Sequence, residues 1–399
     1  MPKTIATTPS WYWPEGLKRA IGIPPFCINR LIQAKWSEKS SSDLVITDGT
    51  RTFYRDEFLK ILTLINSTDI LKQSDDGITG VVLSPDAESF MLFLSSIASH
   101  NNVQVIKNSD TLNYLSNLDA VLVSSFAEHN GTLDPNKLGY RVLSEKDLYA
   151  ISQANSSIVE HDLSKRDPRS IKIYVDGKFG LARHSHKSVL SQSISFIKFF
   201  EPVNDSPWLI RGGIFPWLMI NAAIGCLLYG VPILIGKSAE DAIVLCEKYQ
   251  VSTVVSDLNV EQDDPLKRSK GDNRIRMILG TGSSVQTDVR RNIANNSKAE
   301  VLNVFGCGET GPMLGSHPSW YLQEATGIPF PNMNLIPIDP YTADPIDTLW
   351  EFLDEAGILA WSPSVADPVG EQYIGNKLIT GYHATADPNG MLYILDDGL

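Results

Sequence analysis

The stretch V-L-N-V-F-G-C-G-E-T-G, Val301 to Gly311, ends an apolar run in three closely spaced glycines. Gly306, Gly308 and Gly311 satisfy the G-x-G-x-x-G spacing of a dinucleotide-binding turn. Such a turn must open directly into a helix whose N-terminus faces the pyrophosphate. Here Pro312 and the run G-S-H-P-S soon follow, and no acidic residue ends a second strand about 20 positions later. The context therefore argues against dinucleotide binding.

Outward from this stretch, apolar runs of strand length alternate with longer amphipathic stretches. Helical spacing of apolar residues covers Ala87 to His100 and Ser238 to Tyr249. The predicted buried strands are Gly80 to Ser84, Val103 to Ile106, Ala120 to Ser124, Val231 to Ile235, Val251 to Ser256 and Arg276 to Gly280. This alternation predicts parallel sheets covered by helices, an α/β architecture. After about Thr326, prolines, turns and short alternating strands predict a small β-rich subdomain.

The segment from Gly212 to Gly236 contains no charged residue and is long enough to cross a bilayer. Pro216, Gly230 and Pro232 interrupt it, however, and leave a helix-sized stretch followed by a short Val/Ile-rich stretch. A buried helix followed by a buried strand explains this pattern better than a membrane span.

The bulk properties of the chain exclude several classes of protein. Its 399 residues carry a net charge of -12, which argues against non-specific binding to nucleic acid. No secretion signal is recognisable at the N-terminus, so a cytoplasmic location is expected. The cysteines lie too far apart for a zinc motif and are expected to be reduced and mostly buried: Cys27, Cys226, Cys246 and Cys307.

The stretch that ends in the three glycines resembles the Asn-Gly-Tyr-Gly-x-Thr-Glu signature of the adenylate-forming (ANL) superfamily. That superfamily comprises acyl- and aryl-CoA synthetases, adenylation domains and luciferases. Asn303, Phe305, Gly306 and Glu309 occupy the marked positions of the signature. Further stretches similar to motifs of the superfamily follow in its order: T-F-Y-R-D-E-F (Thr52 to Phe58), S-P-D-A-E-S-F (Ser84 to Phe90), R-I-R-M-I-L-G-T-G-S-S-V (Arg274 to Val285), T-G-I-P-F-P-N-M-N-L (Thr326 to Leu335) and D-P-N-G-M-L-Y-I-L (Asp387 to Leu395).

The resemblance implies the fold of the large N-terminal domain of these enzymes. That fold is a layered αβαβα arrangement with two mostly parallel sheets and a small β-barrel-like subdomain. The whole chain is then one such domain, with subdomains over approximately residues 1–165, 166–325 and 326–399. The mobile C-terminal domain of the family, which carries a lysine that stabilises adenylate formation, is expected to be absent.

The resemblance also places a nucleotide site on this chain. In the family, the signature glutamate helps to hold the magnesium of ATP, so Glu309 is the candidate metal ligand. The signature aromatic residue flanks the adenine and the acyl pocket. The positions of the vestigial nucleotide site are Asp176, Gly177, Lys178, Gly282, Phe305, Gly306, Gly308, Glu309 and Tyr382.

Departures from the family pattern fall on the residues that handle ATP. Gly308 stands where the family has a threonine that contacts phosphate, and Tyr382 stands where an aspartate grips the ribose. The phosphate-binding loop, within Ile173 to Leu190, is short and lacks hydroxyls; Asp176 adds a negative charge there, and Lys178 is the residue that would substitute for the loop lysine. Losing four or five contacts of roughly 1.5–3 kcal/mol each, about 6–15 kcal/mol if additive, predicts that the chain does not adenylate alone.

The acyl pocket of the family lies between three segments: the one after the helix that follows the phosphate-binding loop, a Gly-rich turn, and the signature strand. The matching positions here are Phe215, Trp217, Asn221, Gly280, Thr281 and Val304. Plain core packing is the favoured explanation for Phe215 and Trp217. His184 and His186 fall at the start of the helix that follows the phosphate-binding loop, where a structural role is favoured over metal binding or catalysis.

Three functions are compatible with these residues. The first is an accessory protein that binds an acyl or aryl group, or a thioester on an acyl carrier protein, in a biosynthetic pathway such as a polyketide pathway. The second is a residual acyl- or aryl-CoA ligase completed by a C-terminal domain or partner in trans, which alone would need ATP and magnesium. The third is a structural partner that solubilises a pathway enzyme. No nucleic-acid or membrane partner is expected.

Overall fold

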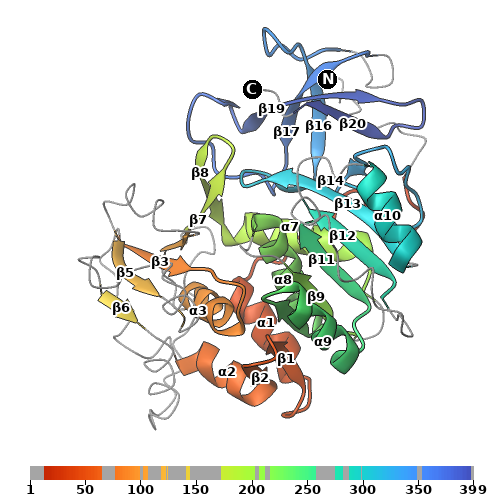
Figure 1. Ribbon diagram of the computed structural model, residues 1–399. Coiled ribbons are helices and arrows are strands. Elements are labelled where there is room, and N and C mark those ends of the chain that lie inside the picture. Colours follow the sequence, from red (N-terminus) through yellow and green to blue (C-terminus); the bar gives the residue numbers. More distant parts are fainter. Residues whose placement is uncertain are drawn as a thin grey trace.

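The computed structural model describes residues 13–64, 77–98, 102–106, 118–122, 124, 141–143, 172–202, 206–211, 216–257, 275–281, 287–297, 299–347 and 353–396. Within them, strands form three sheets of nine, six and five strands (Figure 1). Two of these sheets are mostly parallel and the third is antiparallel. The α/β fold class predicted from the sequence is therefore confirmed, whereas the subdomain boundaries near residues 165 and 325 remain predictions.

The nine-stranded sheet contains the signature strand. Its order is β15-β14-β13-β12-β11-β9-β10-β1-β2, and the six strands from β13 to β1 are parallel to one another. Its members are β1 (Leu44–Thr47), β2 (Thr52–Tyr54), β9 (Trp208–Arg211), β10 (Ile233–Gly236), β11 (Thr253–Asp257), β12 (Met277–Thr281), β13 (Glu300–Cys307), β14 (Gly311–Gly315) and β15 (Ile328–Pro329). Parallel strands buried on both faces are expected to be almost continuously apolar, as these are.

The six-stranded sheet has the order β6-β5-β3-β4-β7-β8 and is parallel except for its last strand. It consists of β3 (Ile78–Val82), β4 (Asn102–Ile106), β5 (Leu118–Leu122), β6 (Arg141–Leu143), β7 (Lys172–Gly177) and β8 (Gly180–Ser185). The third sheet consists of β16 (Asn334–Ile338), β17 (Ala356–Trp361), β18 (Tyr373–Ile374), β19 (Lys377–Ala386) and β20 (Leu392–Asp396). It is the β-rich region predicted after Thr326. Several ends differ from prediction by one or two residues, as in β5, because the ladder stops where the partner strand stops.

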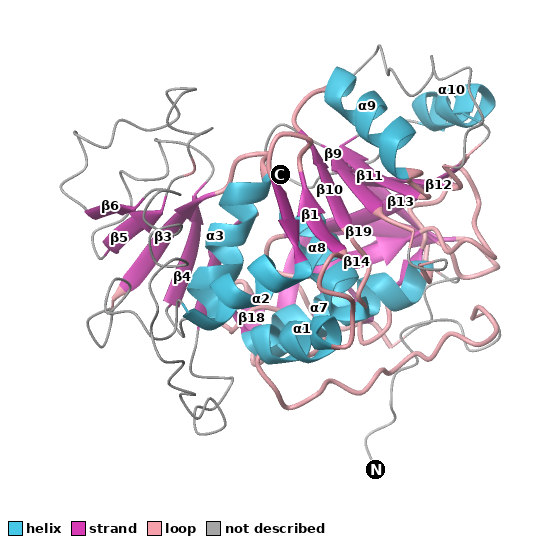
Figure 2. Cartoon of the chain, turned by 90° about the horizontal axis from the view of Figure 1, so that it is seen from below, coloured by secondary structure: helices cyan, strands magenta, loops and turns pink. Residues whose placement is uncertain are grey.

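Helices fill the space between the two mostly parallel sheets and cover the far face of the larger one (Figure 2). The inner layer comprises α1 (Ile28–Ser37), α2 (Arg55–Leu64), α3 (Ala87–Ala98), α7 (His186–Phe200) and α8 (Trp217–Tyr229). The outer pair is α9 (Ala239–Tyr249) and α10 (Thr287–Ser297). No helix of the described ranges is both long and apolar enough to span a membrane.

The uncharged segment predicted as a buried helix and strand is α8 followed by β10. Gly230 ends α8 in the left-handed conformation, with φ of 72°, which an L side chain adopts only with strain. Close packing of α8 on α7 needs Gly225 as well, because a Cβ there would lie 2.7 Å from the carbonyl oxygen of Ser193. This prediction is therefore confirmed.

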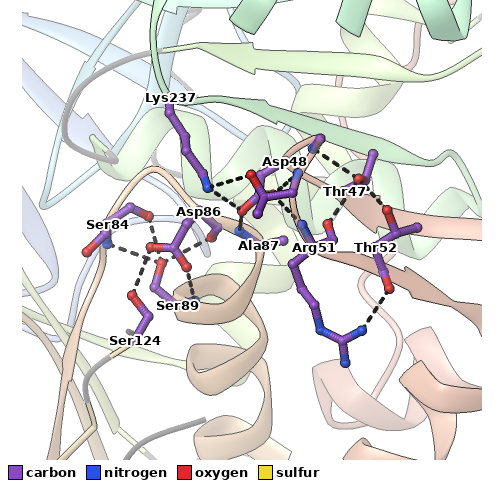
Figure 3. A network of polar contacts seen from close by, with 12 residues as sticks. Thr47, Asp48, Arg51, Thr52, Ser84, Asp86, Ala87, Ser89, Ser124 and Lys237 are labelled. Carbon is purple, nitrogen blue, oxygen red and sulfur yellow. Dashed lines mark hydrogen bonds and ion pairs between the residues drawn. The ribbon is translucent and has the colours of Figure 1, made fainter. Parts of the chain in front are cut away.

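A buried carboxylate joins the two mostly parallel sheets near the carboxyl ends of β1, β3 and β10 (Figure 3). Asp48 Oδ1 accepts from the backbone amides of Thr50 and Arg51, each at 2.8 Å. Its Oδ2 accepts from the amide of Ala87 at 3.1 Å and lies 3.1 Å from Nζ of Lys237. One side chain thus ties the loop after β1 to the start of α3 and to the end of β10.

A second buried carboxylate stands beside it. Asp86 accepts from the amide of Ser89 at 2.8 Å, as the residue preceding α3, and from the hydroxyl of Ser124 at 2.9 Å. Burial raises the pKa of Asp86 to about 6, against the lowering effect of these two hydrogen bonds.

Candidate functional site

The signature stretch forms a tight reversal between two antiparallel strands. β13 runs into the turn and returns as β14, paired Cys307 to Gly311 and Gly306 to Pro312. A Cβ on Gly306 would lie 1.9 Å from the carbonyl oxygen of Gly311, whose own φ is 63°, so both positions require glycine. No helix follows the glycines, which explains their spacing without a dinucleotide.

A hairpin from the other sheet is seated directly on this reversal. β7 and β8 pair up to Gly177 and Gly180, and the turn between them is Lys178–Phe179. A Cβ on Gly308 would lie 2.1 Å from the carbonyl oxygen of Asp176 and 2.6 Å from Cα of Gly177. The backbones can approach this closely only because Gly308 has no side chain. The glycine that replaces the family threonine is therefore a condition for the position of the hairpin.

The carboxylate of Glu309 binds the turn of the hairpin. Its Oε2 accepts from the backbone amide of Lys178 at 3.0 Å, and its Oε1 accepts from the amide of Phe179 at 2.8 Å. Glu309 is 2% exposed, and a Cβ on Gly177 would lie 2.2 Å from Oε1. Both oxygens of the predicted metal ligand are thus used to hold the chain's own backbone.

Lys178 crosses from the hairpin to the third sheet. Its Nζ donates to the carbonyl oxygen of Gly381 at 2.8 Å and lies 3.7 Å from the ring centroid of Tyr382, a cation–π contact. The ring of Tyr382 also meets Phe305 edge to face, with centroids 4.9 Å apart. The structure therefore brings together eight of the nine predicted nucleotide-site positions, from β7, the hairpin turn, β13 with its turn, and β19, and Lys178 contacts Tyr382 among them.

His184 forms a hydrogen bond with the turn between β13 and β14. Its Nε2 donates to the carbonyl oxygen of Gly308 at 2.6 Å, so its Nδ1 is an acceptor, within 3.3 Å of Nε2 of Gln192 and 3.1 Å of the hydroxyl of Ser188. Its ring stacks on Trp217 with centroids 5.3 Å apart. Burial lowers the pKa of His184 to about 4, so the ring is neutral at pH 7. These contacts describe a packed, hydrogen-bonded support, as the sequence favoured.

The segment around Asp367 completes the site and was not predicted from the sequence. Asp367 lies 2.5 Å from Nζ of Lys172 and 3.2 Å from Nε of Arg183, which tie it to both strands of the hairpin. The amide of Ala366 donates to the carbonyl oxygen of Glu309 at 2.7 Å. These partners come from segments far apart in the chain, and no local motif marks them.

The predicted acyl-pocket residues lie mostly in the packed core. Asn221 donates to the carbonyl of Trp217 at 2.9 Å and accepts from Ser193 at 3.2 Å, inside the α7–α8 contact. Val304 is buried in the same core, and Gly280 and Thr281 end β12 beside it. Phe215 and Gly282 lie outside the described residues. Of the five acyl-pocket positions that the structure describes, Trp217 alone has a buried polar atom, Nε1, without a hydrogen-bond partner.

No group of three His, Cys, Asp or Glu side chains is placed to hold a metal ion in the part of the chain that the structure describes. The four cysteines are free thiols, two buried and two half-buried. Burial, together with the charge of Glu309, raises the pKa of the Cys307 thiol to about 12, which leaves it unreactive.

Comparison with known proteins supports the resemblance at the level of the fold. No family model and no curated protein matches the sequence. Solved structures do match. A luciferase-like enzyme from the nonluminescent mealworm Zophobas morio superposes with a TM-score of 0.77 over 95% of this chain and 98% of its own, at 14% identity. A long-chain-fatty-acid-CoA ligase from Archaeoglobus fulgidus gives 0.76 over 94% and 85%, at 13% identity.

An O-succinylbenzoate coenzyme A synthetase from Bacillus subtilis, solved with ATP and a magnesium ion, gives a TM-score of 0.73 over 92% of this chain and 79% of its own, at 13% identity. At these identities the likeness establishes the fold and not the activity. Each of the three structures superposes on at least 92% of this chain. This chain has the fold of the large N-terminal domain of the ANL superfamily of adenylate-forming enzymes.

Proposed function

We propose that this protein is a degenerate relative of AMP-forming acyl- and aryl-CoA ligases that does not adenylate by itself. In this proposal it handles an acyl or aryl group, or a thioester on an acyl carrier protein, for other enzymes of a biosynthetic pathway such as a polyketide pathway. A cytoplasmic setting without nucleic-acid or membrane partners belongs to the same proposal. The seat of the β7–β8 hairpin on the signature turn is the observation that carries it.

The position of Glu309 supports the loss of magnesium handling. A cation would have to replace two amide protons that already bind the carboxylate at 3.0 and 2.8 Å. Hydrogen bonds to a charged group contribute roughly 1.5–3 kcal/mol each, so displacing both would weaken binding by about 10² to 10⁴-fold. The residues present therefore do not fit a magnesium-bound ATP unless the hairpin moves.

The contacts of Lys178 and Tyr382 support the loss of the nucleotide itself. The ammonium group that would meet phosphate instead donates to Gly381 and lies over the ring of Tyr382. That ring stands where the family has a carboxylate that accepts from both ribose hydroxyls, and a phenol cannot accept two such bonds. Both side chains are thus engaged with the chain's own groups, which supports the loss of nucleotide binding.

Trp217 supports the acyl part of the proposal. Its indole Nε1 is a buried donor without a partner, at the start of α8 and against the support of the signature turn. An acyl or thioester carbonyl would satisfy that donor. Together with Phe215, Asn221, Gly280, Thr281 and Val304, it forms the proposed ligand-facing set.

The residual ligase remains the second candidate because Glu309 is retained and lies at the signature turn. Binding that displaces the hairpin would return its carboxylate to a metal. A third candidate, a structural partner of a pathway enzyme, has no single contact in its favour.

Three measurements test the proposal on the full chain. Titration calorimetry with Mg·ATP and with AMP should give no heat, and pyrophosphate release with a panel of carboxylic acids should stay at background. Thermal melting with acyl- and aryl-CoA thioesters, and with an acylated carrier protein, should show stabilisation. Carboxylate-dependent pyrophosphate release that disappears in Glu309→Ala, but not in the exposed control Glu324→Ala, would establish the ligase instead. No stabilisation by any thioester would sink the acyl-handling role.

A further inference from the structure

A row of polar and small residues crosses the nine-stranded sheet near the carboxyl ends of its parallel strands. Ser256 is paired in register with Arg211 on one side and Gly280 on the other, and Gly280 is paired with Asn303. The amide of Ser316, just after β14, donates to the carbonyl of Asn303 at 2.9 Å, which extends the row. Residues in register project to one face of a sheet, so these side chains share a face.

That face is the one covered by α9 and α10. Two residues back along the strands, the same face carries a purely apolar row that packs in one cluster with residues of both helices. Its members are Leu209, Val254, Ile278 and Val301. The polar row therefore begins where the apolar packing ends, at the edge of the sheet where parallel α/β proteins bind ligands.

Arg290 stands over this edge. It lies in the first turn of α10, one turn before Ile293, which belongs to the same buried cluster as Ile278 and Val301 of the apolar row. Helical side chains lean toward the helix N-terminus, so Arg290 is directed beyond the apolar row, over Gly280 and Asn303. It is 4% exposed, yet its Nε and Nη1 have no hydrogen-bond partner.

Two residues of the row share this property. Oδ1 of Asn303 and the hydroxyl of Ser316 are buried without partners, although these side chains are only 2% and 1% exposed. Buried polar groups are nearly always satisfied, and each exception calls for an explanation such as a ligand. The nearby carboxylate of Glu324 does not explain why these atoms lack partners. Burial lowers the pKa of Arg290, and the charge of Glu324 only partly opposes this, because the Glu324 carboxylate is paired with Arg291 at 2.5 Å.

We propose that Arg290, Asn303 and Ser316 form a binding site for a small oxyanion, a phosphate or carboxylate group, at the N-terminal end of α10. The guanidinium group donates one of its unpartnered N–H groups to the anion, and the hydroxyl of Ser316 donates a second hydrogen bond. The positive end of the α10 dipole favours the same charge. Asn303 accepts from a neighbouring hydroxyl or amide of the ligand. This site is separate from the hairpin contacts of Glu309 and holds whether or not the proposed function does.

The test uses the full chain with inorganic phosphate and, separately, acetate as probes, at ionic strength held constant with sodium chloride. Thermal melting and titration calorimetry are run on the wild type, on Arg290→Met, and on the matched control Arg291→Met, whose side chain is 51% exposed. At least one probe should stabilise the wild type and the control. Arg290→Met should bind that probe about 10- to 100-fold more weakly, since it loses charge-assisted hydrogen bonds.

The probe that binds identifies the anion. Stabilisation by phosphate alone assigns a phosphate site, and stabilisation by acetate as well assigns a general carboxylate or phosphate site. No stabilisation of the wild type by either probe overturns the proposal, and so does an equal shift in Arg290→Met, which would reveal only an adventitious surface ion. If Arg290→Met does not fold, Arg290→Lys and Ser316→Ala take its place, each expected to weaken binding at least several-fold.

Discussion

Two buried carboxylate regions hold this molecule together, and they do so differently. At the junction of the two mostly parallel sheets, Asp48 is balanced by Lys237 and Asp86 accepts from a side-chain hydroxyl. At the signature turn, Glu309 is held by two backbone amides from a hairpin about 130 residues earlier in the chain. The first region is ordinary support of the fold. In the second, a carboxylate of the signature stretch holds the backbone of a distant hairpin, and the difference teaches that buried carboxylates can stabilise a fold through either side-chain or backbone partners.

The largest expected effect comes from restoring the family threonine. In Gly308→Thr, the new Cβ would overlap the backbone of Asp176 and Gly177, so the hairpin must leave its seat. We expect a loss of about 3–5 kcal/mol in the free energy of unfolding, at the upper end for single substitutions. Urea denaturation measures it. Gly22→Ala, where a Cβ meets nothing within 4 Å, is the control and should change little. Equal stabilities would show that the hairpin is not seated on Gly308.

The second prediction removes the clasp. Glu309→Ala leaves the amides of Lys178 and Phe179 without an acceptor, so we expect a loss of about 3 kcal/mol and faster hydrogen exchange of those two amides. Hydrogen exchange followed by mass spectrometry locates the effect. The exposed Glu324→Ala should leave the hairpin protected. Unchanged protection in Glu309→Ala would contradict the clasp and favour a free, metal-binding carboxylate.

These two regions also mark what the sequence could predict. Periodicity identified the buried strands and the α8–β10 segment, because apolar spacing directly reflects burial on a sheet or helix. The motifs located Glu309, Gly308 and Tyr382 near one another. They could not reveal the seat of the hairpin, because the partners of Glu309 are backbone amides, which every residue type except proline carries. The sequence did not predict the roles of Asp86 and Arg290 for a related reason. Tertiary packing determines which groups bond to Asp86 and leaves atoms of Arg290 without a partner.

The third prediction concerns Asp86, at the junction of the two mostly parallel sheets. Here the substitution is expected to raise the free energy of unfolding at pH 7, whereas the first two lower it. The pKa of Asp86 is raised from 3.8 to about 6 by burial, so the folded state binds this proton more tightly than the unfolded chain does. The stability it contributes is complete below pH 4 and is lost as the pH rises through about 6, a change of about 3 kcal/mol. Asp86→Asn can accept from Ser89 and donate to Ser124, so we expect it to be more stable than the wild type at pH 7.

Urea denaturation between pH 4 and pH 8 checks this expectation. Asp86→Asn should lack the fall in stability that the wild type shows across this range, whereas Asp56→Asn, at a side chain 62% exposed, should keep it. Identical pH profiles for the wild type and Asp86→Asn would mean that Asp86 is not the group that titrates. The charges facing it, Glu88 and Asp48, both raise its pKa and stay in place in this variant.

The smallest effect is expected at Lys178. Its two contacts with the third sheet determine whether its ammonium group is held in place or is available to a ligand. Lys178→Met removes the hydrogen bond to Gly381 and the cation–π contact with Tyr382 but keeps the apolar stem. Because the side chain is only partly buried, we expect a loss of about 1–2 kcal/mol in unfolding free energy. Lys187→Met, at an exposed position on α7, should cost less than about 0.5 kcal/mol. If both variants cost the same, Lys178 is not fixed on the third sheet and its ammonium group is available to an anion. In that case the hairpin turn would be a partial substitute for the phosphate-binding loop. That result would favour the residual ligase, although the hydrogen bonds of Glu309 argue against it.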